Sequence, residues 1–184
     1  MIDNYTIKEL NAVTFDEVTK NRKQPIVMKV NIGDKKKFNF NQLSMVDEDI
    51  MVNVRVYGTD RKVTPRDQWT SFCEFTQMRF SNYLAKVNSG VAESEGLYLA
   101  LFEVGNTKLA KLFRSTLNSI SDSSSLQSQE TNDINLWVSP PNHLEPLHFD
   151  GDDGTLIQFS GRKKVTLIDP KYSKKLYPFP WWKG

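Results

Sequence analysis

The fold is decided most clearly by one stretch of the sequence, LHFDGDDGTLIQFSGRKKVTLIDP, which comprises residues 147–170. Short apolar runs in this stretch alternate with polar residues, and glycine-containing turns separate them at 151–154 and 161–162. Alternation with a period of two is typical of strands that bury one face, and closely spaced turns join such strands into antiparallel sheets. We therefore predict three strands here, at residues 147–150, 155–160 and 163–168.

The preceding sequence mixes strand and helix patterns. Residues 51–57 alternate apolar and polar side chains, as a half-buried strand does, and residues 97–102 form a short apolar run typical of a buried strand. Phe80, Tyr83, Leu84 and Val87 recur at the spacing of one helix face and predict an amphipathic helix that ends near 89–90. Weaker patterns predict strands at 26–30 and 135–138, a helix from a capping box at 14–17 to about residue 23, and a helix at about 108–117.

Together these patterns predict an α+β chain that is mainly β, in which helices decorate the N-terminal part of an antiparallel jelly roll. With 184 residues, 39% hydrophobic and 25% charged, the chain is long enough to bury a single core. We expect an N-terminal α/β region at 1–133, which includes a serine-rich loop at 119–133. We expect residues 134–184 to supply the first strands of the roll.

Composition excludes several classes of protein. A net charge of +2 gives no strong signal for a polyanion-binding protein, and the single cysteine, Cys73, excludes an intramolecular disulfide framework and a cysteine-based zinc site. The N-terminus lacks a basic segment followed by an apolar one, and no apolar run approaches the roughly 20 residues of a membrane span. We therefore expect a soluble cytoplasmic or nuclear protein without a membrane partner.

The chemistry-bearing residues begin with His148 and Asp150. Side chains two residues apart on a strand point to the same face, so this imidazole and this carboxylate can converge. They are two parts of the two-histidine, one-carboxylate triad that holds non-haem iron. The chain has one other histidine, His143, which we expect to be an ordinary hydrogen-bonding residue at a strand entrance rather than the third ligand.

Lys163 and Gln158 extend this arrangement. A lysine on a neighbouring inner strand needs an anionic partner, because a buried unpaired ammonium group is costly. A dicarboxylate that chelates a metal at one end and pairs with Lys163 at the other meets that need, and Gln158 could line the same cavity. Taken alone, a His-x-Asp pattern is weak, because any strand can contain it.

The order of these residues resembles the first half of the metal-binding core of the cupin-like Jumonji-C (JmjC) family. The elements that carry the resemblance are a Trp-containing strand at 136–137, Pro146 to Asp150, Gln158, residues 161–164, Asp169-Pro170, and residues 176–178. The pattern is similar to that of the family's asparaginyl hydroxylases and small hydroxylases, whose core is a double-stranded β-helix. Residues 24–27 also look like the family's early strand.

The resemblance implies an Fe(II)- and 2-oxoglutarate-dependent dioxygenase that oxidises a protein, RNA or small-molecule substrate. It implies that His148 and Asp150 bind iron and that Lys163 pairs with the distal carboxylate of 2-oxoglutarate. Tyr98 resembles the tyrosine that assists this lysine, although a core tyrosine is an equal alternative.

Two departures from the family pattern stand out. Glu145 occupies the position, three residues before the first metal ligand, where related enzymes often have a threonine. An anion there would repel the co-substrate unless it turns outward. The family's second iron-binding histidine has no counterpart here, so we expect the C-terminal half of the barrel to be missing from this sequence.

Alternatives therefore stay open. The first is a non-catalytic cupin-like binding module, and the second is a cupin that uses another divalent metal for isomerase or lyase chemistry, against which Lys163 counts. The aromatic tail at 177–182 could form a homodimer contact, but packing within its own domain is favoured.

Overall fold

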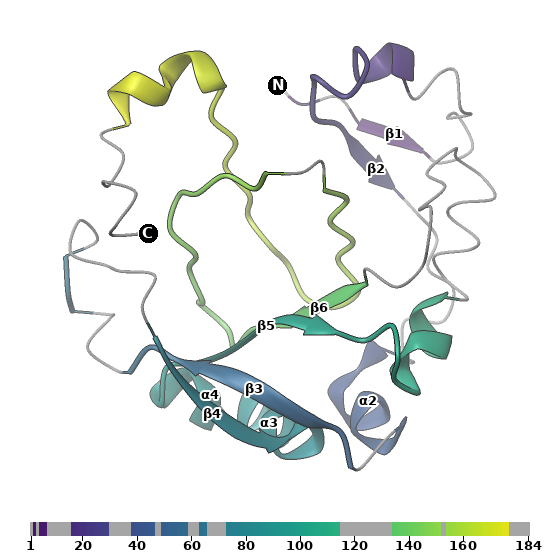
Figure 1. Ribbon diagram of the computed structural model, residues 1–184, viewed down its shortest axis with the longest axis vertical. Helices are drawn as coiled ribbons and strands as arrows, with labels where there is room; N and C mark the ends of the chain where they lie inside the picture. Colours follow the sequence, from purple (N-terminus) through teal and green to yellow (C-terminus); the bar gives the residue numbers. More distant parts are fainter. Residues whose placement is uncertain are drawn as a thin grey trace.

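The computed structural model describes residues 2, 4–6, 16–29, 38–46, 49–58, 63–65, 73–114, 134–151 and 154–176. Four antiparallel strands form its central sheet: β3 (Met51–Val56), β4 (Glu74–Arg79), β5 (Leu97–Glu103) and β6 (Asn135–Val138). Their order across the sheet is β4-β3-β5-β6 (Figure 1). The strands predicted at 51–57, 97–102 and 135–138 are confirmed.

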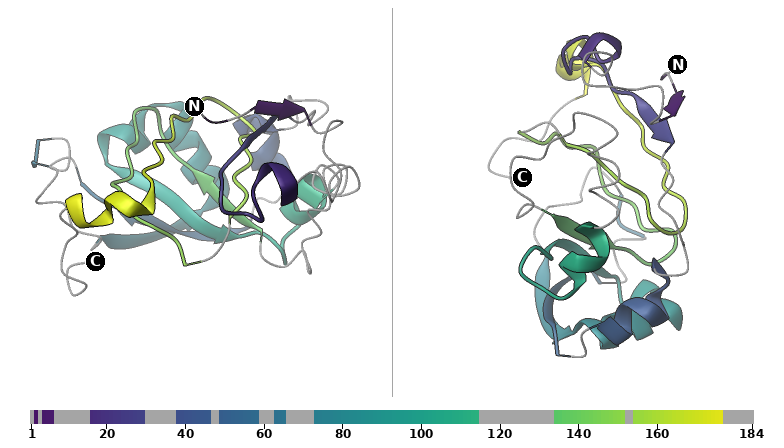
Figure 2. Two further views of the ribbon diagram at one scale, coloured as in Figure 1. Left: turned by 90° about the horizontal axis from the view of Figure 1, so that it is seen from above. Right: turned by 90° about the vertical axis from the view of Figure 1, so that its right-hand side faces the viewer.

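Helices cover one face of this sheet. They are α2 (Phe40–Val46), α3 (Phe80–Asn88) and α4 (Val91–Ser94). Residues 109–114 are also helical, in agreement with the helix predicted there. A parallel pair, β1 (Asn4–Thr6) and β2 (Val27–Lys29), and a 3-10 helix, η5 (Pro170–Lys175), lie at the opposite end of the molecule (Figure 2).

The core lies between the sheet and α3. Alternate residues of β3, Val52 and Val54, are buried, as are the four predicted positions of α3. Each such side chain contributes about 1.5–3 kcal/mol when it leaves water. The amphipathic helix predicted from the apolar periodicity of residues 80–87 is therefore confirmed. Its C-cap residue is Ser89, which precedes Gly90 with a φ of 80°.

Tyr83 of α3 joins β5 to β6 at the point where the register of these two strands shifts. Its hydroxyl donates to the carbonyl oxygen of Val138 at 2.6 Å and accepts from the backbone N–H of Leu99 at 3.1 Å. Leu99 and Val138 are partners beside the bulge. The hydroxyl thus satisfies one buried donor and one buried acceptor and fixes both strands to the helix.

Gly96 makes the close connection between β3 and β5. Its carbonyl accepts from the backbone N–H of Tyr57 at 2.9 Å, and its φ is +66°. A Cβ atom on Gly96 would lie 2.3 Å from the carbonyl oxygen of Gly58. Only glycine allows this approach of the two backbones.

The segments from residue 139 onward differ from the prediction. Residues 139–151 and 154–169 lie between the sheet and the end that holds β1, β2 and η5 (Figure 1), and Phe159 packs on Phe38 and Phe113 of the core. None of residues 147–150, 155–160 and 163–168 is in a strand, so the three strands predicted there are wrong. Among the described residues, no neighbouring strand pairs with these segments to form a hydrogen-bonded ladder.

The first predicted helix is also shorter than expected. Residues 16–18 are helical, but Lys20, Asn21 and Arg22 adopt left-handed conformations, with φ of 51°, 55° and 64°. Left-handed residues cannot continue a right-handed helix, so the prediction of a helix to residue 23 is wrong. Thr14, the serine-rich loop at 119–133 and the aromatic tail at 177–182 lie outside the described residues.

Candidate functional site

His148 is held in one tautomer by its own loop. Its Nδ1 lies 2.8 Å from the carbonyl oxygen of Pro146, and a carbonyl can only accept a hydrogen bond. Nδ1 therefore carries a proton, and in the neutral ring the lone pair is on Nε2. Nε2 lies 3.9 Å from Oδ1 of Asp150. A hydrogen bond at the far nitrogen is the usual way in which proteins orient a metal-binding histidine.

These two atoms are farther apart than adjacent ligands of one divalent cation. Donors about 2.1 Å from a cation at a right angle to one another are about 3 Å apart, so the two exposed side chains would have to move closer together to share a cation. Among the described residues, no group of three His, Cys, Asp or Glu side chains could hold a metal ion. The described residues therefore contain only two candidate donors at this position.

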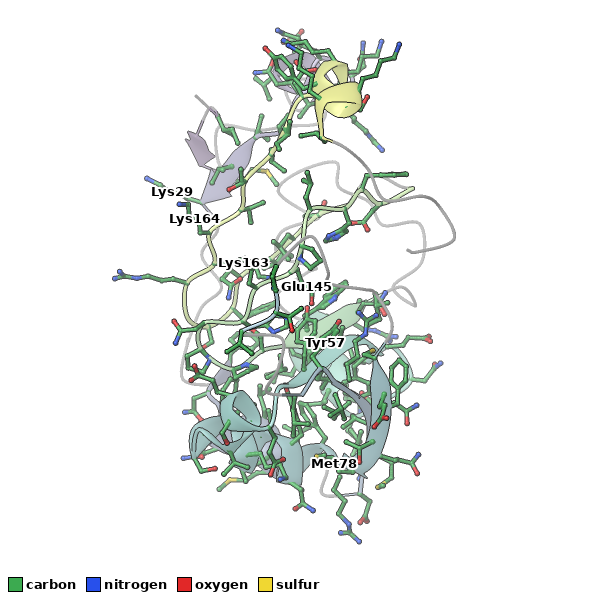
Figure 3. All side chains as sticks on the ribbon, turned by 90° about the vertical axis from the view of Figure 1, so that its left-hand side faces the viewer. Lys29, Tyr57, Met78, Glu145, Lys163 and Lys164 are labelled. Carbon is green, nitrogen blue, oxygen red and sulfur yellow. The ribbon has the colours of Figure 1, made fainter. Side chains whose placement is uncertain are left out.

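Gln158 and Lys163 are both exposed. The Gln158 amide donates to the carbonyl oxygen of Ser160 at 2.6 Å. Lys163 has no ion-pair partner within the described part of the chain. In Figure 3 it is directed toward the part of the molecule that contains Glu145 and Tyr57, whereas Lys164 is directed to the side on which Lys29 of β2 lies. The roles predicted for Gln158 and Lys163 stay predictions.

Tyr98 belongs to a compact group of polar and aromatic side chains, which we call the Tyr98 cluster: Arg55, Tyr57, Tyr98, His143 and Glu145. The rings of Tyr98 and His143 have centroids 3.9 Å apart, and Tyr57 stacks on Tyr98 at 6.5 Å. His143 Nε2 lies 2.8 Å from Oε1 of Glu145. His143 is thus a hydrogen-bonding residue, as predicted.

Charges in the Tyr98 cluster influence one another. Burial raises the pKa of the Tyr98 hydroxyl well above its ordinary value, and the Glu145 carboxylate raises it further. The pKa of Arg55 is raised overall. Burial alone would lower this pKa, but the hydrogen bond to Tyr57 at 3.3 Å and the charge of the nearby Glu145 are among the causes that raise it. The Glu145 carboxylate is therefore close enough to act on both side chains.

Glu145 does not turn outward. Its side chain is 30% exposed and its carboxylate faces His143, whose side chain is 14% exposed. The residues around Tyr98 therefore fit a dicarboxylate poorly while Glu145 stays in place, because a second carboxylate beside Tyr98 would meet an anion already there.

Sequence analysis gave no role to two members of the cluster, Arg55 and Tyr57. Arg55 lies on β3 as the register partner of Tyr98 on β5, and Tyr57 follows two residues later, just after β3 ends. The alternation of residues 51–57 already placed both on the face opposite Val52 and Val54. The signal was present, but the partner strand that brings them to Tyr98 could not be identified from the sequence.

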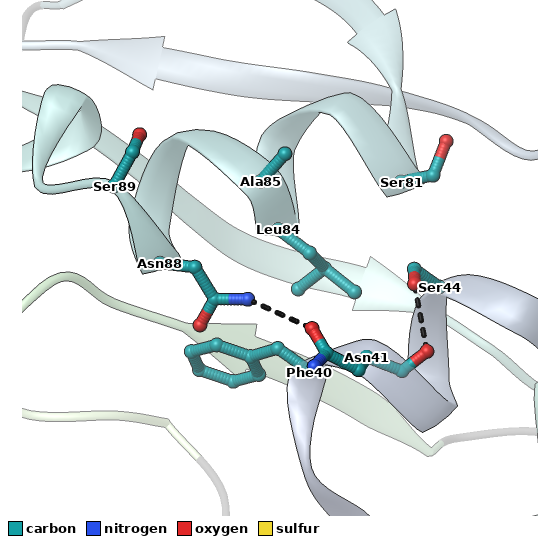
Figure 4. Close-up of a pocket in the computed structure, with 8 residues that line it drawn as sticks. All are labelled: Phe40, Asn41, Ser44, Ser81, Leu84, Ala85, Asn88 and Ser89. Atoms are coloured by element: carbon teal, nitrogen blue, oxygen red, sulfur yellow. Dashed lines mark hydrogen bonds between the residues drawn. The ribbon is translucent and has the colours of Figure 1, made fainter.

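A separate groove of about 380 Å³ lies between α2 and α3 (Figure 4). Its polar side chains bond to one another or to nearby backbone: the Asn88 amide donates to Asn41, and the Ser44 hydroxyl donates to the carbonyl oxygen of Asn41. Neither the Tyr98 cluster nor the pair of His148 and Asp150 lines this groove. We assign it no chemistry.

None of the helices in the described residues is long and apolar enough to cross a membrane.

Comparison with known proteins gives one family match that covers most of the chain. The model of the cupin-like domain matches residues 12–183. JmjC domain-containing protein D of Dictyostelium discoideum is 44% identical over 46 residues, which are 25% of this chain and 10% of that protein.

Two relatives are named as demethylases. Lysine-specific demethylase JMJ31 of Arabidopsis thaliana is 33% identical over 89 residues, 46% of this chain and 16% of that protein. Lysine-specific demethylase 8 of Danio rerio is 42% identical over 45 residues, 24% of this chain and 11% of that protein. Each match thus spans about a sixth or less of the relative's length.

Proposed function

This chain belongs to the cupin-like domain family and resembles JmjC proteins, and we propose that it acts as an Fe(II)- and 2-oxoglutarate-dependent dioxygenase of the hydroxylase or demethylase type. The family assignment also agrees with the predicted mainly β, jelly-roll class, to which the antiparallel sheet corresponds. One observation carries the functional proposal. His148 Nε2 lies 3.9 Å from Oδ1 of Asp150, while its Nδ1 is bonded to the carbonyl oxygen of Pro146.

Each residue has a distinct role in this proposal. Bound iron, together with 2-oxoglutarate, would supply the oxidising power to hydroxylate a C–H bond. His148 contributes a neutral nitrogen whose orientation is fixed by Pro146, and Asp150 contributes a negative charge that favours a cation. Lys163 provides an ammonium group for the distal carboxylate of the co-substrate. A third metal donor from outside the described residues is required.

The substrate class follows from the relatives alone. Two of them are lysine-specific demethylases by name. We take a methylated lysine side chain of a protein as the first substrate to test for this chain, ahead of RNA and small molecules. No described residue distinguishes these classes, since a family fold does not set its substrate.

The test uses the intact protein and follows consumption of 2-oxoglutarate with Fe(II), with Zn(II) and without metal. We expect turnover only with Fe(II), and a loss of at least 100-fold in Asp150→Ala. Asp49→Ala is the matched control, because Asp49 is an exposed carboxylate that pairs with Arg79 on the sheet. Undiminished turnover in Asp150→Ala contradicts the proposal.

A second candidate function is a non-catalytic cupin-like binding module. The position of Glu145, inside the Tyr98 cluster rather than turned away from it, favours this alternative. The same assay separates the two functions. A module binds metal through His148 and Asp150 but consumes no 2-oxoglutarate with any metal.

A further inference from the structure

The position beside Tyr98 already contains a carboxylate, that of Glu145. The His143 ring nitrogen lies 2.8 Å from it, and the Arg55 guanidinium and the Tyr98 hydroxyl are near enough for its charge to act on both. Such a set of groups recognises an anion. In this chain the anion is internal.

We propose that Glu145 is a specificity-determining residue that fills the carboxylate position of the Tyr98 cluster and weakens the binding of dicarboxylates such as 2-oxoglutarate at least tenfold. This inference rests on the proposed function, because it concerns the co-substrate of that site. It makes the chain self-inhibited with respect to its own co-substrate.

Geometry explains why Glu145 stays in place. The His143 ring packs on Tyr98 at a tilt of 30°, with ring centroids 3.9 Å apart, and its centroid lies 6.3 Å from that of Tyr57. It is therefore fixed to the sheet on one side and hydrogen-bonded to Glu145 on the other. The short turn after Pro140, in which Asn142 has φ of 59°, brings both residues back onto β5.

An incoming dicarboxylate faces two obstacles. It must approach an anion in a half-buried position, where like charges repel more strongly than in water. It must also replace the hydrogen bond that His143 makes with Glu145. A neutral side chain at position 145 removes the first obstacle and, if it is short, also leaves space beside Tyr98.

The experiment measures 2-oxoglutarate binding by isothermal titration calorimetry, with Mn(II) in place of Fe(II). We expect Glu145→Gln and Glu145→Thr to bind 2-oxoglutarate at least tenfold more tightly than the unaltered protein. Glu103→Gln is the matched control, because it removes the same charge from an exposed position on β5 and should leave affinity unchanged. The double variant Glu145→Thr, Tyr98→Phe should lose most of the gain, which a purely structural role of Glu145 does not predict.

Two outcomes overturn the inference. One is that the unaltered protein binds 2-oxoglutarate as tightly as both Glu145 variants do. The other is that no variant binds it at all, because Glu145 then is not what excludes it. Mn(II) binding, measured on the same samples, separates failure of the proposed function from failure of this inference. Absence of metal binding rejects the dioxygenase assignment. The inference about Glu145 is judged only by the difference in 2-oxoglutarate affinity between the variants and the unaltered protein.

Discussion

The sheet with its helices and the described segments between residues 139 and 169 both contain regularly spaced apolar residues, yet the second region leaves most of them exposed. Phe80 of α3 is 0% exposed, whereas Phe149 is 93% exposed. Each central strand of the sheet has hydrogen-bonded neighbours, while the later segment has none among the described residues. The difference teaches that alternation produces a strand only where another strand completes its backbone hydrogen bonds.

Truncation of one phenylalanine in each region gives the largest expected contrast. Phe80→Ala should lower the free energy of unfolding by about 3–5 kcal/mol, because it leaves a cavity in the core. Phe149→Ala should change it by less than about 0.5 kcal/mol, because the ring contributes little burial. Urea titration measures both. If Phe80→Ala does not fold, Phe80→Leu, which should lower the free energy of unfolding by less, replaces it. Equal changes in the free energy of unfolding at positions 80 and 149 would contradict the distinction between the two regions.

Removal of a tyrosine hydroxyl tests the same contrast through hydrogen bonds. Tyr83→Phe deprives the N–H of Leu99 and the carbonyl oxygen of Val138 of their partner, so we expect a loss of about 2–3 kcal/mol in the free energy of unfolding. Tyr172→Phe in η5 changes an exposed ring and should have almost no effect. A loss below about 0.5 kcal/mol in Tyr83→Phe would show that the helix does not fix β5 to β6.

Two glycines sharpen the comparison with a smaller effect. Gly96→Ala combines a left-handed backbone with a 2.3 Å approach to Gly58, and we expect a loss of at least about 2 kcal/mol. Gly161→Ala has the same backbone cost, but its Cβ meets nothing within 4 Å, so about 1 kcal/mol is expected. Thermal unfolding of the two variants measures the difference. Equal midpoints would mean that the close approach at Gly96 relaxes without cost.

Much of the first region could be predicted from the sequence. The spacing of Phe80, Tyr83, Leu84 and Val87 identified the buried face of α3 because local periodicity and final packing agree there. The apolar run at 97–102 identified β5 for the same reason. The link from the Tyr83 hydroxyl to the backbone could not be predicted, because it depends on a bulge between two strands far apart in the sequence.

The candidate site was only partly predictable. The two-residue spacing of His148 and Asp150 predicted that their side chains lie close together on a strand. Their nearest atoms are 3.9 Å apart, but the two residues lie in a loop, in which His148 bonds to the carbonyl oxygen of Pro146. The inward position of Glu145 and the contributions of Arg55 and Tyr57 depend on tertiary contacts with β3 and β5. Sequence patterns show which residues are unusual, but they do not show which charges come together.

The most direct test of the proposed site is an anaerobic titration with Co(II) as a substitute for Fe(II), followed by its visible absorption. We predict that the intact protein binds one equivalent of Co(II) and that His148→Ala and Asp150→Ala each weaken Co(II) binding at least tenfold. His143→Gln, which alters the other histidine, should leave binding unchanged, because that ring serves the Tyr98 cluster. Unaltered binding in both His148→Ala and Asp150→Ala, or loss of binding in His143→Gln, would contradict the assignment of the metal site.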